Sequence, residues 1–328
     1  MRVHLIGDAG RQKAVLEPLL PPGTAGIDVL PREAAATDAF DDRIGPDDVV
    51  VALRFRREGS APAFRLLHVP GAGLDGIGFD RLAPDCRVCN VFEHEAPIAE
   101  YVLAAMLNWR IGLDRMRFTA SGWGNAQRGR IPHGELAGTT VAILGFGRIG
   151  REVARRARAF DMRVATFDRR LSEADARLVD ERVPAGDLHA LLAGADFVVL
   201  ACPLTDETRG LIGRAALAAM KASAVLVNVS RAEIADEAAL YEALRDGVIG
   251  GAVLDVWYHY PVGADDHPAP SDLPFLDLPN VVATPHVSAW TTNLPGRRYR
   301  VIADNIRRLA SGEPLVNQVW PAAAEAGR

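Results

Sequence analysis

The stretch TTVAILGFGRIG, residues 139–150, places three glycines directly between a predicted strand and a predicted helix. In such a turn Gly145 permits the tight change of direction, Gly147 lets a phosphate approach the backbone, and Gly150 lets the helix pack on the strand. The amino end of the helix that follows, residues 148–160, then faces the pyrophosphate of a dinucleotide. The pattern therefore predicts a doubly wound parallel sheet with a dinucleotide site at the start of this helix.

An acidic residue at the expected distance supports this interpretation. The next predicted strand, MRVATF, ends at Asp168, about 20 residues after Gly145, where such folds place the carboxylate that binds the adenosine ribose. Arg169 and Arg170 follow directly, and guanidinium groups bind a 2′-phosphate. NAD is the favoured cofactor because the carboxylate repels a 2′-phosphate, and NADP stays open because of the two arginines.

Side chains suited to binding or catalysis follow several strands of the same predicted sheet. They are Cys202 with Pro203, Ser230 with Arg231, Asp255, and His286. Because ligands of an open parallel sheet bind beyond the carboxyl ends of its strands, these residues are expected to meet at one edge. A guanidinium clamps a carboxylate through two parallel hydrogen bonds, and an imidazole gives or takes the proton of a hydroxyl. Together with a nicotinamide they indicate hydride transfer to or from a 2-hydroxy acid.

Strand-like and helical stretches alternate along the 328 residues in two series, which favours two domains over one. The first series has strands at RVHLI, IDVL, DDVVVAL, FRLLHV and CRVCNV and a helix near AVLEPLL, and it predicts a smaller flavodoxin-like α/β lobe. A long apolar helix then starts at Pro97, and residues 117–134 are predicted to form a loop. The second series, with strands at TTVAIL, MRVATF, DFVVLA, AVLVNV, GAVLDV and NVVATP, predicts a Rossmann-type lobe.

Composition and charge limit the kinds of partner. A net charge of −5 provides no basic surface for nucleic acid or a membrane, and the arginines of the helix 148–160 are expected on a solvated face. Three cysteines cannot form a disulfide framework, so a cytoplasmic location is expected, and Cys86 and Cys89 in DCRVCNV favour a plain strand over metal or redox chemistry. Neither MRVHLIGDAG nor any apolar run predicts a signal peptide or a membrane span. The expected partner is a small molecule, and no metal is expected.

Several motifs in order make the chain resemble the D-isomer-specific 2-hydroxyacid dehydrogenase family over nearly its whole length. The matching stretches are HVPGAGLDGI, IAEYVLAAML, LAGTTVAILGFGRIGREVARRARAF, CPLTDETRGLI, MKASAVLVNVSRAEIADEAAL, GAVLDVW and LPNVVATPHVS. The resemblance implies that Arg231 binds the substrate carboxylate, that His286 is the acid/base, and that Asp255 faces the nicotinamide carboxamide. It further implies a homodimer formed through the cofactor lobe.

The resemblance also implies domain boundaries and a set of binding residues. The substrate-binding lobe is expected at residues 1–96, completed by 291–328, and the dinucleotide-binding domain at 97–290. The expected cofactor site comprises Gly145, Gly147, Arg148, Ile149, Gly150, Asp168, Arg169, Cys202, Pro203, Thr208, Val229, Ser230, Asp255, His286 and Ser288. The candidate substrate contacts are Arg54, Ala72, Gly73, His94, Arg231 and Trp290, and Phe55 is a further candidate for shaping the pocket.

The largest departure from the family lies near the catalytic histidine. Relatives read Asp-Val-Phe-x-x-Glu-Pro, with the glutamate paired to the histidine, whereas this chain has Tyr260 at the glutamate position. A glutamate raises the pKa of the histidine, while a neutral phenol orients the ring without adding charge. Tyr260 is therefore the expected third catalytic residue, and a carboxylate folded in from Glu100, Asp265 or Asp266 is the alternative. With Tyr260 as the partner, the pKa of His286 is expected near or below its ordinary value of about 6.5.

Two smaller departures and several rival functions stay open. Ala232 stands where the family has glycine after the arginine, and NVFEHEAP places Glu93, His94 and Glu95 near the expected substrate site. The missing glutamate resembles formate dehydrogenases of the family, and Arg54 resembles the phosphate-binding arginine of phosphoglycerate dehydrogenases. A small keto acid such as glyoxylate or hydroxypyruvate is the favoured substrate. A non-enzymatic, NADH-sensing interaction protein of the same fold is the alternative from another class.

Overall fold

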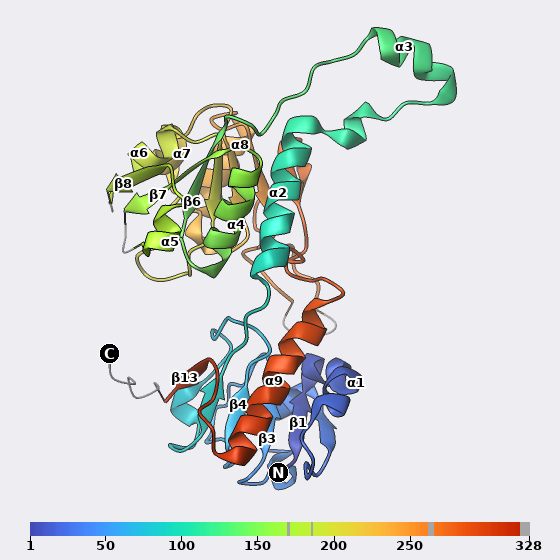
Figure 1. The fold of residues 1–328 in the computed structure, drawn as a ribbon, viewed down its shortest axis with the longest axis vertical. Helices are drawn as coiled ribbons and strands as arrows, with labels where there is room; N and C mark the ends of the chain where they lie inside the picture. Colours follow the sequence, from blue (N-terminus) through green and yellow to red (C-terminus); the bar gives the residue numbers. More distant parts are fainter. Residues whose placement is uncertain (169–170, 185, 262–265, 322–328) are drawn as a thin grey trace. The chain divides into compact units, whose positions relative to one another are not determined.

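The computed structural model describes residues 1–168, 171–184, 186–261 and 266–321 (Figure 1). The chain divides into two compact units, each with its own sheet. Unit 1 comprises Met1–Glu93 with Thr291–Arg328, and unit 2 comprises His94–Trp290. The division therefore falls between Glu93 and His94, close to the boundary at residue 96 expected from the sequence.

Unit 1 contains a six-stranded sheet in the order β13-β5-β4-β3-β1-β2, which is parallel except for β13. The order 2-1-3-4-5 of its first five strands is that of flavodoxin-like folds, as predicted. The strands are β1 Val3–Ile6, β2 Ile27–Leu30, β3 Val49–Val51, β4 Leu66–His68, β5 Arg87–Cys89 and β13 Gln318–Trp320, and the helices are α1 Lys13–Leu16 and α9 Leu294–Ser311. Short 3₁₀ turns connect them at Gly7–Gln12, Glu17–Leu19, Arg32–Ala35, Asp41–Arg43 and Phe79–Arg81.

Unit 2 contains a seven-stranded parallel sheet in the order β12-β11-β10-β9-β6-β7-β8, which is the doubly wound Rossmann order. The strands are β6 Thr140–Leu144, β7 Arg163–Asp168, β8 Glu181–Pro184, β9 Phe197–Leu200, β10 Val225–Asn228, β11 Gly251–Leu254 and β12 Val281–Ala283. The helices are α2 Glu95–Ile111, α3 Trp123–Arg128, α4 Arg148–Ala159, α5 Glu173–Ala176, α6 Leu188–Ala193, α7 Arg214–Ala219 and α8 Glu237–Arg245. One apolar cluster joins α2 and α4 to the sheet and another joins α6, α7 and α8, so helices cover both faces. The predicted fold class is thus confirmed.

Four sequence-based expectations need correction. The strands β8 and β13 were not predicted, because ERVP and QVW are too short and polar to show a period. Residues 117–134 are not purely a loop, since they contain α3, which stands away from the sheet of unit 2 in Figure 1. The helix near AVLEPLL is a single turn flanked by 3₁₀ turns, and Pro18 limits its length. Phe55 does not shape a pocket, because it is 1% exposed in the core of unit 1, edge-on to Phe64 at 5.6 Å between ring centroids.

The cysteine pair and the arginine-rich helix have structural roles. Cys86 and Cys89 are buried in two different apolar clusters of unit 1, and burial raises the pKa of each thiol to about 12. They therefore act as apolar core residues rather than as thiolate ligands. On α4 the arginines pair with acids, as Arg151 does with Asp175 at 2.7 Å and Arg158 with Asp180 at 2.7 Å. No helix of the described residues is long and apolar enough to span a bilayer.

Unit 1 contains a histidine that is stable only in its neutral form. His68 on β4 is fully buried, and its Nε2 accepts a hydrogen bond from Asn305 Nδ2 of α9 at 3.0 Å. The amide of Asn305 cannot flip, because its Oδ1 accepts from Val316 N at 2.8 Å and its Nδ2 donates to Val316 O at 2.9 Å. Burial lowers the pKa of His68 from 6.5 to about 4. In a protonated His68 the Nε2–H would face the N–H of Asn305 Nδ2, which places two hydrogen-bond donors against each other in a buried site.

We therefore expect acid to destabilise unit 1 through His68. The pKa of His68 is lower in the folded state than in the unfolded state, so neutral His68 contributes to the free energy of unfolding. This contribution is fully present above pH 6.5, and about 3 kcal/mol of it is lost as the pH falls from 6.5 towards 4. His68→Gln keeps an acceptor for Asn305 and does not titrate, so it should abolish this part of the acid dependence. Hydrogen exchange of the β4 amides between pH 7 and pH 4.5 measures the difference, and equal acid sensitivity of both proteins would contradict the assignment.

Candidate active site

The glycine turn between β6 and α4 has the geometry of a phosphate-binding turn. Gly145 has φ +102°, and a Cβ on it would overlap the backbone of Ala201 and Cys202. A Cβ on Gly150 would overlap the carbonyl oxygen of Gly145, so the helix can approach the turn only with glycine there. Gly147, the N-cap of α4, instead has nothing within 4 Å of a Cβ position, which leaves the amino end of the helix open. These residues fit a bound pyrophosphate.

The structure describes some of the other residues expected around the dinucleotide, but not all of them. Ile149 packs against the core of unit 2, and Arg148 lies 3.7 Å from Glu95, measured from Nη1 to Oε1. The backbone of Asp168 ends β7, as the sequence predicts, but its side chain and the whole of Arg169 lie outside the described part of the chain. The adenosine end of the cofactor site therefore stays a prediction.

The loop after β9 is tied to the end of β10. Thr208 Oγ1 donates to Pro203 O at 2.8 Å and accepts from Thr205 N at 2.8 Å, so this side chain closes the loop. Ser230 Oγ donates to the carbonyl oxygen of Cys202. Cys202, Pro203 and Ser230 are thus brought together at one edge of the sheet.

Arg231 leaves the end of β10 in a direction fixed by a buried side chain that sequence analysis missed. Asn228 is 1% exposed, its Nδ2 donates to Arg231 O at 2.9 Å, and its Oδ1 accepts from Ser230 N at 3.1 Å. Arg231 itself donates from Nη1 to Ser230 O at 2.9 Å, and Val229 is buried before it. Asn228 is polar at the end of an apolar run, which is the only signal in the sequence that it has a positioning role.

Asp255 holds the turn that carries the histidine. The side chain is 0% exposed at the end of β11 and accepts three hydrogen bonds, from Thr284 Oγ1 at 2.5 Å, Val287 N at 2.8 Å and Ser288 N at 2.9 Å. His286 lies between these donors with φ +57°, a left-handed conformation that side chains rarely adopt. The carboxylate binds the Thr284 hydroxyl before His286 and the backbone N–H groups of Val287 and Ser288 after it, and these bonds hold His286 in this strained conformation. The sequence pointed to Asp255, but for its contact with the cofactor rather than for this role.

A second buried group supports the same turn. Tyr101 of α2 places its hydroxyl 2.7 Å from Thr284 Oγ1, and Trp257 Nε1 donates to Thr284 O at 2.9 Å. Burial raises the pKa of Tyr101, so the phenol is neutral at physiological pH. Tyr101, Trp257 and Thr284 were not expected from the sequence, because their partners are far apart in the chain.

Tyr260 is the hydrogen-bond partner of His286. The Tyr260 hydroxyl lies 2.9 Å from His286 Nδ1, and it also accepts from the backbone N–H of Trp257 at 3.1 Å. Glu100 pairs with Arg156 at 3.5 Å, Asp266 is exposed, and Asp265 lies outside the described residues. Of the alternatives that lie within the described residues, neither Glu100 nor Asp266 is hydrogen-bonded to the imidazole of His286.

Electrostatics at the pair favour a neutral imidazole. Partial burial of the ring lowers the pKa of His286 below 6.5, Asp255 raises it, and the positive charge of Arg231 lowers it. Burial also raises the pKa of Tyr260, so the phenol stays protonated at neutral pH. Arg231, Tyr260, Asp255 and His286 therefore form one electrostatically coupled group at the carboxyl edge of the sheet.

The candidate substrate residues lie in both units. In unit 1, Arg54 is exposed just after β3, Ala72 accepts from Asn90 Nδ2 at 3.0 Å through its carbonyl oxygen, and Gly73 is exposed. In unit 2, His94 is the N-cap of α2, and Trp290 is 68% exposed at the end of the unit.

One cluster of potential metal ligands was not expected. Glu237, His259 and Asp272 bring one ligand atom each within 4.8 Å of one another. Their present contacts are with one another and with Ser271: His259 Nε2 lies 3.1 Å from Asp272 Oδ1, and Glu237 Oε1 accepts from Ser271 Oγ at 2.5 Å and from Asp272 N at 2.9 Å.

Comparison with known proteins agrees with this architecture. The family model described as D-isomer specific 2-hydroxyacid dehydrogenase, NAD binding domain, matches residues 101–288. D-3-phosphoglycerate dehydrogenase of Methanocaldococcus jannaschii is 34% identical over 253 residues, which cover 75% of this chain and 47% of that enzyme. Glyoxylate/hydroxypyruvate reductase B of Pectobacterium carotovorum is 45% identical over 183 residues, which cover 56% of this chain and 54% of that enzyme. The chain thus spans about half the length of these curated relatives.

A solved structure extends the similarity to both units. The D-isomer specific 2-hydroxyacid dehydrogenase family protein of Aeromonas salmonicida superposes with a TM-score of 0.74 at 26% identity, covering 97% of this chain and 98% of that one. The family model alone matches more than half of the chain. The chain therefore belongs to the D-isomer specific 2-hydroxyacid dehydrogenase family and carries the NAD-binding domain of that family in unit 2.

Proposed function

We propose that the chain is an NAD-dependent oxidoreductase that interconverts a small 2-keto acid and a D-2-hydroxy acid, of the glyoxylate or hydroxypyruvate type. The observation that carries the proposal is the Tyr260–His286 pair, held on the turn that Asp255 anchors and coupled to the charge of Arg231. The names of two relatives, a glyoxylate/hydroxypyruvate reductase and a phosphoglycerate dehydrogenase, support the substrate class.

The glycine turn at the start of α4 would hold the pyrophosphate of NAD, with Asp168 on the ribose. When bound, NAD supplies or accepts the hydride at the carbon next to the substrate carboxylate. Arg231 would bind that carboxylate through two hydrogen bonds and so fix the carbon beside it. Because a guanidinium recognises a carboxylate, the same arginine favours a 2-keto acid over a neutral carbonyl compound as the substrate.

His286 would move the proton through Nε2, because Nδ1 is bonded to Tyr260. In the direction of reduction the imidazolium gives the Nε2 proton to the carbonyl oxygen, and in the direction of oxidation the neutral ring takes it from the hydroxyl. The Tyr260 oxygen has two lone pairs, so it can accept from Trp257 N and from Nδ1–H of the imidazolium at once. Tyr260 therefore orients the ring in both protonation states without adding a negative charge.

The test is oxidation of NADH by the purified chain with glyoxylate, hydroxypyruvate and phosphohydroxypyruvate. Turnover with the first two and poor use of the third would support the proposal. Preference for phosphohydroxypyruvate, lost in Arg54→Gln, would indicate a phosphoglycerate-type enzyme instead. Tight NADH binding without turnover of any of them, or of formate with NAD, would indicate a sensor. The same assay with NADPH decides between the two cofactors.

Replacing Tyr260 with glutamate should shift the pH dependence of reduction. Reduction needs imidazolium, so its rate falls about tenfold per pH unit above the pKa of His286, which in the wild type lies below 6.5. A carboxylate at position 260 stabilises imidazolium and moves this decline to higher pH. We expect Tyr260→Glu to be faster than the wild type near pH 8 when rates are expressed relative to their acid plateau, as read from kcat/KM profiles.

Tyr260→Phe is the matched control, because it removes the hydroxyl without adding charge. We expect about a fivefold lower rate from the lost hydrogen bond to Nδ1, with the decline at nearly the wild-type pH. A wild-type reduction rate that stays flat well into the alkaline range would contradict the role of Tyr260 and point to a carboxylate partner of His286.

We also propose that the chain is a cytoplasmic homodimer formed through unit 2. The segment around α3 exposes an apolar set, namely Leu113, Met116, Phe118, Trp123 and Ile131, which a monomer would leave in water. Three free cysteines are in keeping with a reducing compartment. Sedimentation equilibrium at twice the chain mass of 35.3 kDa is the expected result, and a concentration-independent monomer would contradict it.

A further inference from the structure

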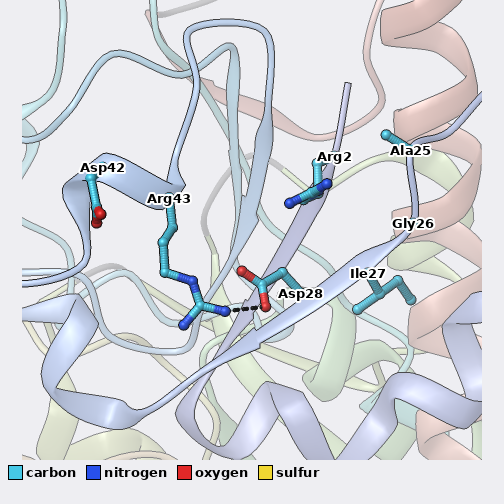
Figure 2. Close-up of a pocket in the computed structure, with 7 residues that line it drawn as sticks. All are labelled: Arg2, Ala25, Gly26, Ile27, Asp28, Asp42 and Arg43. Atoms are coloured by element: carbon cyan, nitrogen blue, oxygen red, sulfur yellow. Dashed lines mark hydrogen bonds and ion pairs between the residues drawn. The ribbon is translucent and has the colours of Figure 1, made fainter.

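Unit 1 has a cavity of about 470 Å³ at the edge of its sheet opposite the strand ends that precede Arg54 and Ala72. Arg2 and Gly26, the residues directly before β1 and β2, line it together with Ala25, Ile27, Asp28, Asp42 and Arg43 (Figure 2). A volume of this size is ordinary for a small-molecule site. None of these residues belongs to the proposed catalytic group, so any ligand here would be additional to NAD and the keto acid.

The charges of the cavity are balanced and alternate in space. Figure 2 shows Asp42, Arg43, Asp28 and Arg2 following one another across the view, with Arg43 bonded to Asp28 at 2.5 Å. Two guanidinium and two carboxylate groups give the lining no net charge. A simple anion or a simple cation would therefore be attracted by one pair and repelled by the other.

Two of the four charged groups are left for a ligand. Within the described part of the chain the side chains of Arg2 and Asp42 have no hydrogen-bond or ion-pair partner, unlike Arg43 and Asp28. A guanidinium binds a carboxylate through parallel hydrogen bonds, and a carboxylate accepts from an ammonium group. A ligand that carries both groups can bind the two side chains at the same time.

The central carboxylate of the cavity, that of Asp28, lies beside a buried histidine. His4 on β1 is fully buried, with Nε2 3.0 Å from Asp48 Oδ2 and Nδ1 3.6 Å from Asp28 Oδ2. Asp48 is held in turn by Arg2 N at 2.6 Å and Gly45 N at 2.9 Å. At 3.6 Å the contact of Asp28 with His4 is too long for a hydrogen bond, and Asp28 Oδ2 is buried without a donor. Asp28 is thus bonded to Arg43 through Oδ1 and buried at Oδ2, whereas Asp42 is exposed.

We propose that this cavity binds a small zwitterion, with its carboxylate on Arg2 and Arg43 and its ammonium group on Asp42. The chemical class is that of an α-amino acid, whose two charged groups are on one carbon. Arg2→Gln and Asp42→Asn each remove one of the two unpartnered charges, and each should weaken binding about tenfold. Asp28 is not a suitable test position, because its replacement would also disturb His4.

The experiment is equilibrium dialysis of the 328-residue chain against radiolabelled glycine and L-glutamine. Acetate and methylammonium, which carry one charge each, serve as competitors and should bind at least about tenfold more weakly than glycine. Arg11→Gln and Asp8→Asn are matched controls, because they change an exposed Arg–Asp pair outside the cavity and should bind like the wild type. Arg231→Ala should also retain binding, since it removes only the proposed substrate clamp in unit 2.

Each other outcome overturns the proposal. Absence of saturable glycine binding would show that the cavity is only a charged surface depression. Acetate that competes as well as glycine would identify a plain anion site. Binding lost in Arg231→Ala but kept in Arg2→Gln and Asp42→Asn would locate the amino acid at the substrate site instead.

Discussion

His286→Gln should lower kcat for keto-acid reduction by about 10²- to 10⁴-fold, the usual contribution of a positioned general acid. Glutamine can keep a hydrogen bond to Tyr260 but has no proton to give at physiological pH. The turn should survive, because Asp255 binds the backbone of Val287 and Ser288 rather than the imidazole. The measurement is steady-state reduction of glyoxylate with NADH across pH, in which the variant should also lose the pH-dependent decline.

His259→Gln is the matched control for this prediction. His259 is a neighbouring histidine, but its Nε2 faces Asp272 at 3.1 Å and it makes no contact with His286 among the described interactions. We expect less than about a threefold change in kcat from losing this exposed pair. Activity that depended equally on both histidines, or that persisted in His286→Gln, would contradict the assignment of the acid/base.

Arg231→Ala should lower kcat/KM by about 10²- to 10³-fold, because it leaves the substrate carboxylate without its charged partner. Arg231→Lys keeps the charge but loses the two-bond geometry, and it should recover only part of the loss. NADH binding, followed by tryptophan fluorescence, should change little, since the glycine turn at Gly145 and Gly147 does not depend on Arg231. The loss is therefore expected in use of the keto acid rather than in cofactor affinity.

Removing Arg231 should also act on the proton transfer. Its positive charge lowers the pKa of His286, so Arg231→Ala should raise that pKa and move the decline of the reduction rate to higher pH. Arg214→Ala removes an exposed cation that pairs with Glu242, and it should affect neither the rate nor the pH profile. An Arg231→Ala enzyme with normal kcat/KM would rule out the carboxylate clamp and favour a different anion-binding residue.

Much of the site was predictable because chain order and strand ends are encoded locally. The spacing of Gly145, Gly147 and Gly150 fixes a turn that other residues cannot form without overlap, as the collisions at Gly145 and Gly150 show. Parallel strands with short connections bring their carboxyl ends to one edge, so Arg231, Asp255 and His286 could be placed together from their positions after strands. Short polar strands such as β8 carry no such signal, and they were missed.

The partners of these residues depend on contacts between distant parts of the chain. Tyr101 is hydrogen-bonded to Thr284, and Asp255 to Val287 and Ser288, and these partners are too far apart in the sequence for a periodic pattern or a motif to predict the contacts. The same is true of His68 with Asn305 in unit 1. Side-chain hydrogen bonds of this kind depend on ångström-scale placement, which packing decides and local sequence does not.

The sequence by itself determined the fold class and the dinucleotide turn, because glycine geometry and strand alternation act over a few residues, and it placed Arg231, Asp255 and His286 after strands of one sheet. It also showed that the usual glutamate is replaced by Tyr260. Only the tertiary structure decided what Tyr260 does, by bringing its hydroxyl to His286 Nδ1 and to the N–H of Trp257. Only the tertiary structure likewise assembled Arg2, Asp28, Asp42 and Arg43 around one cavity, since the charges of separate loops become a site when the sheet places them together.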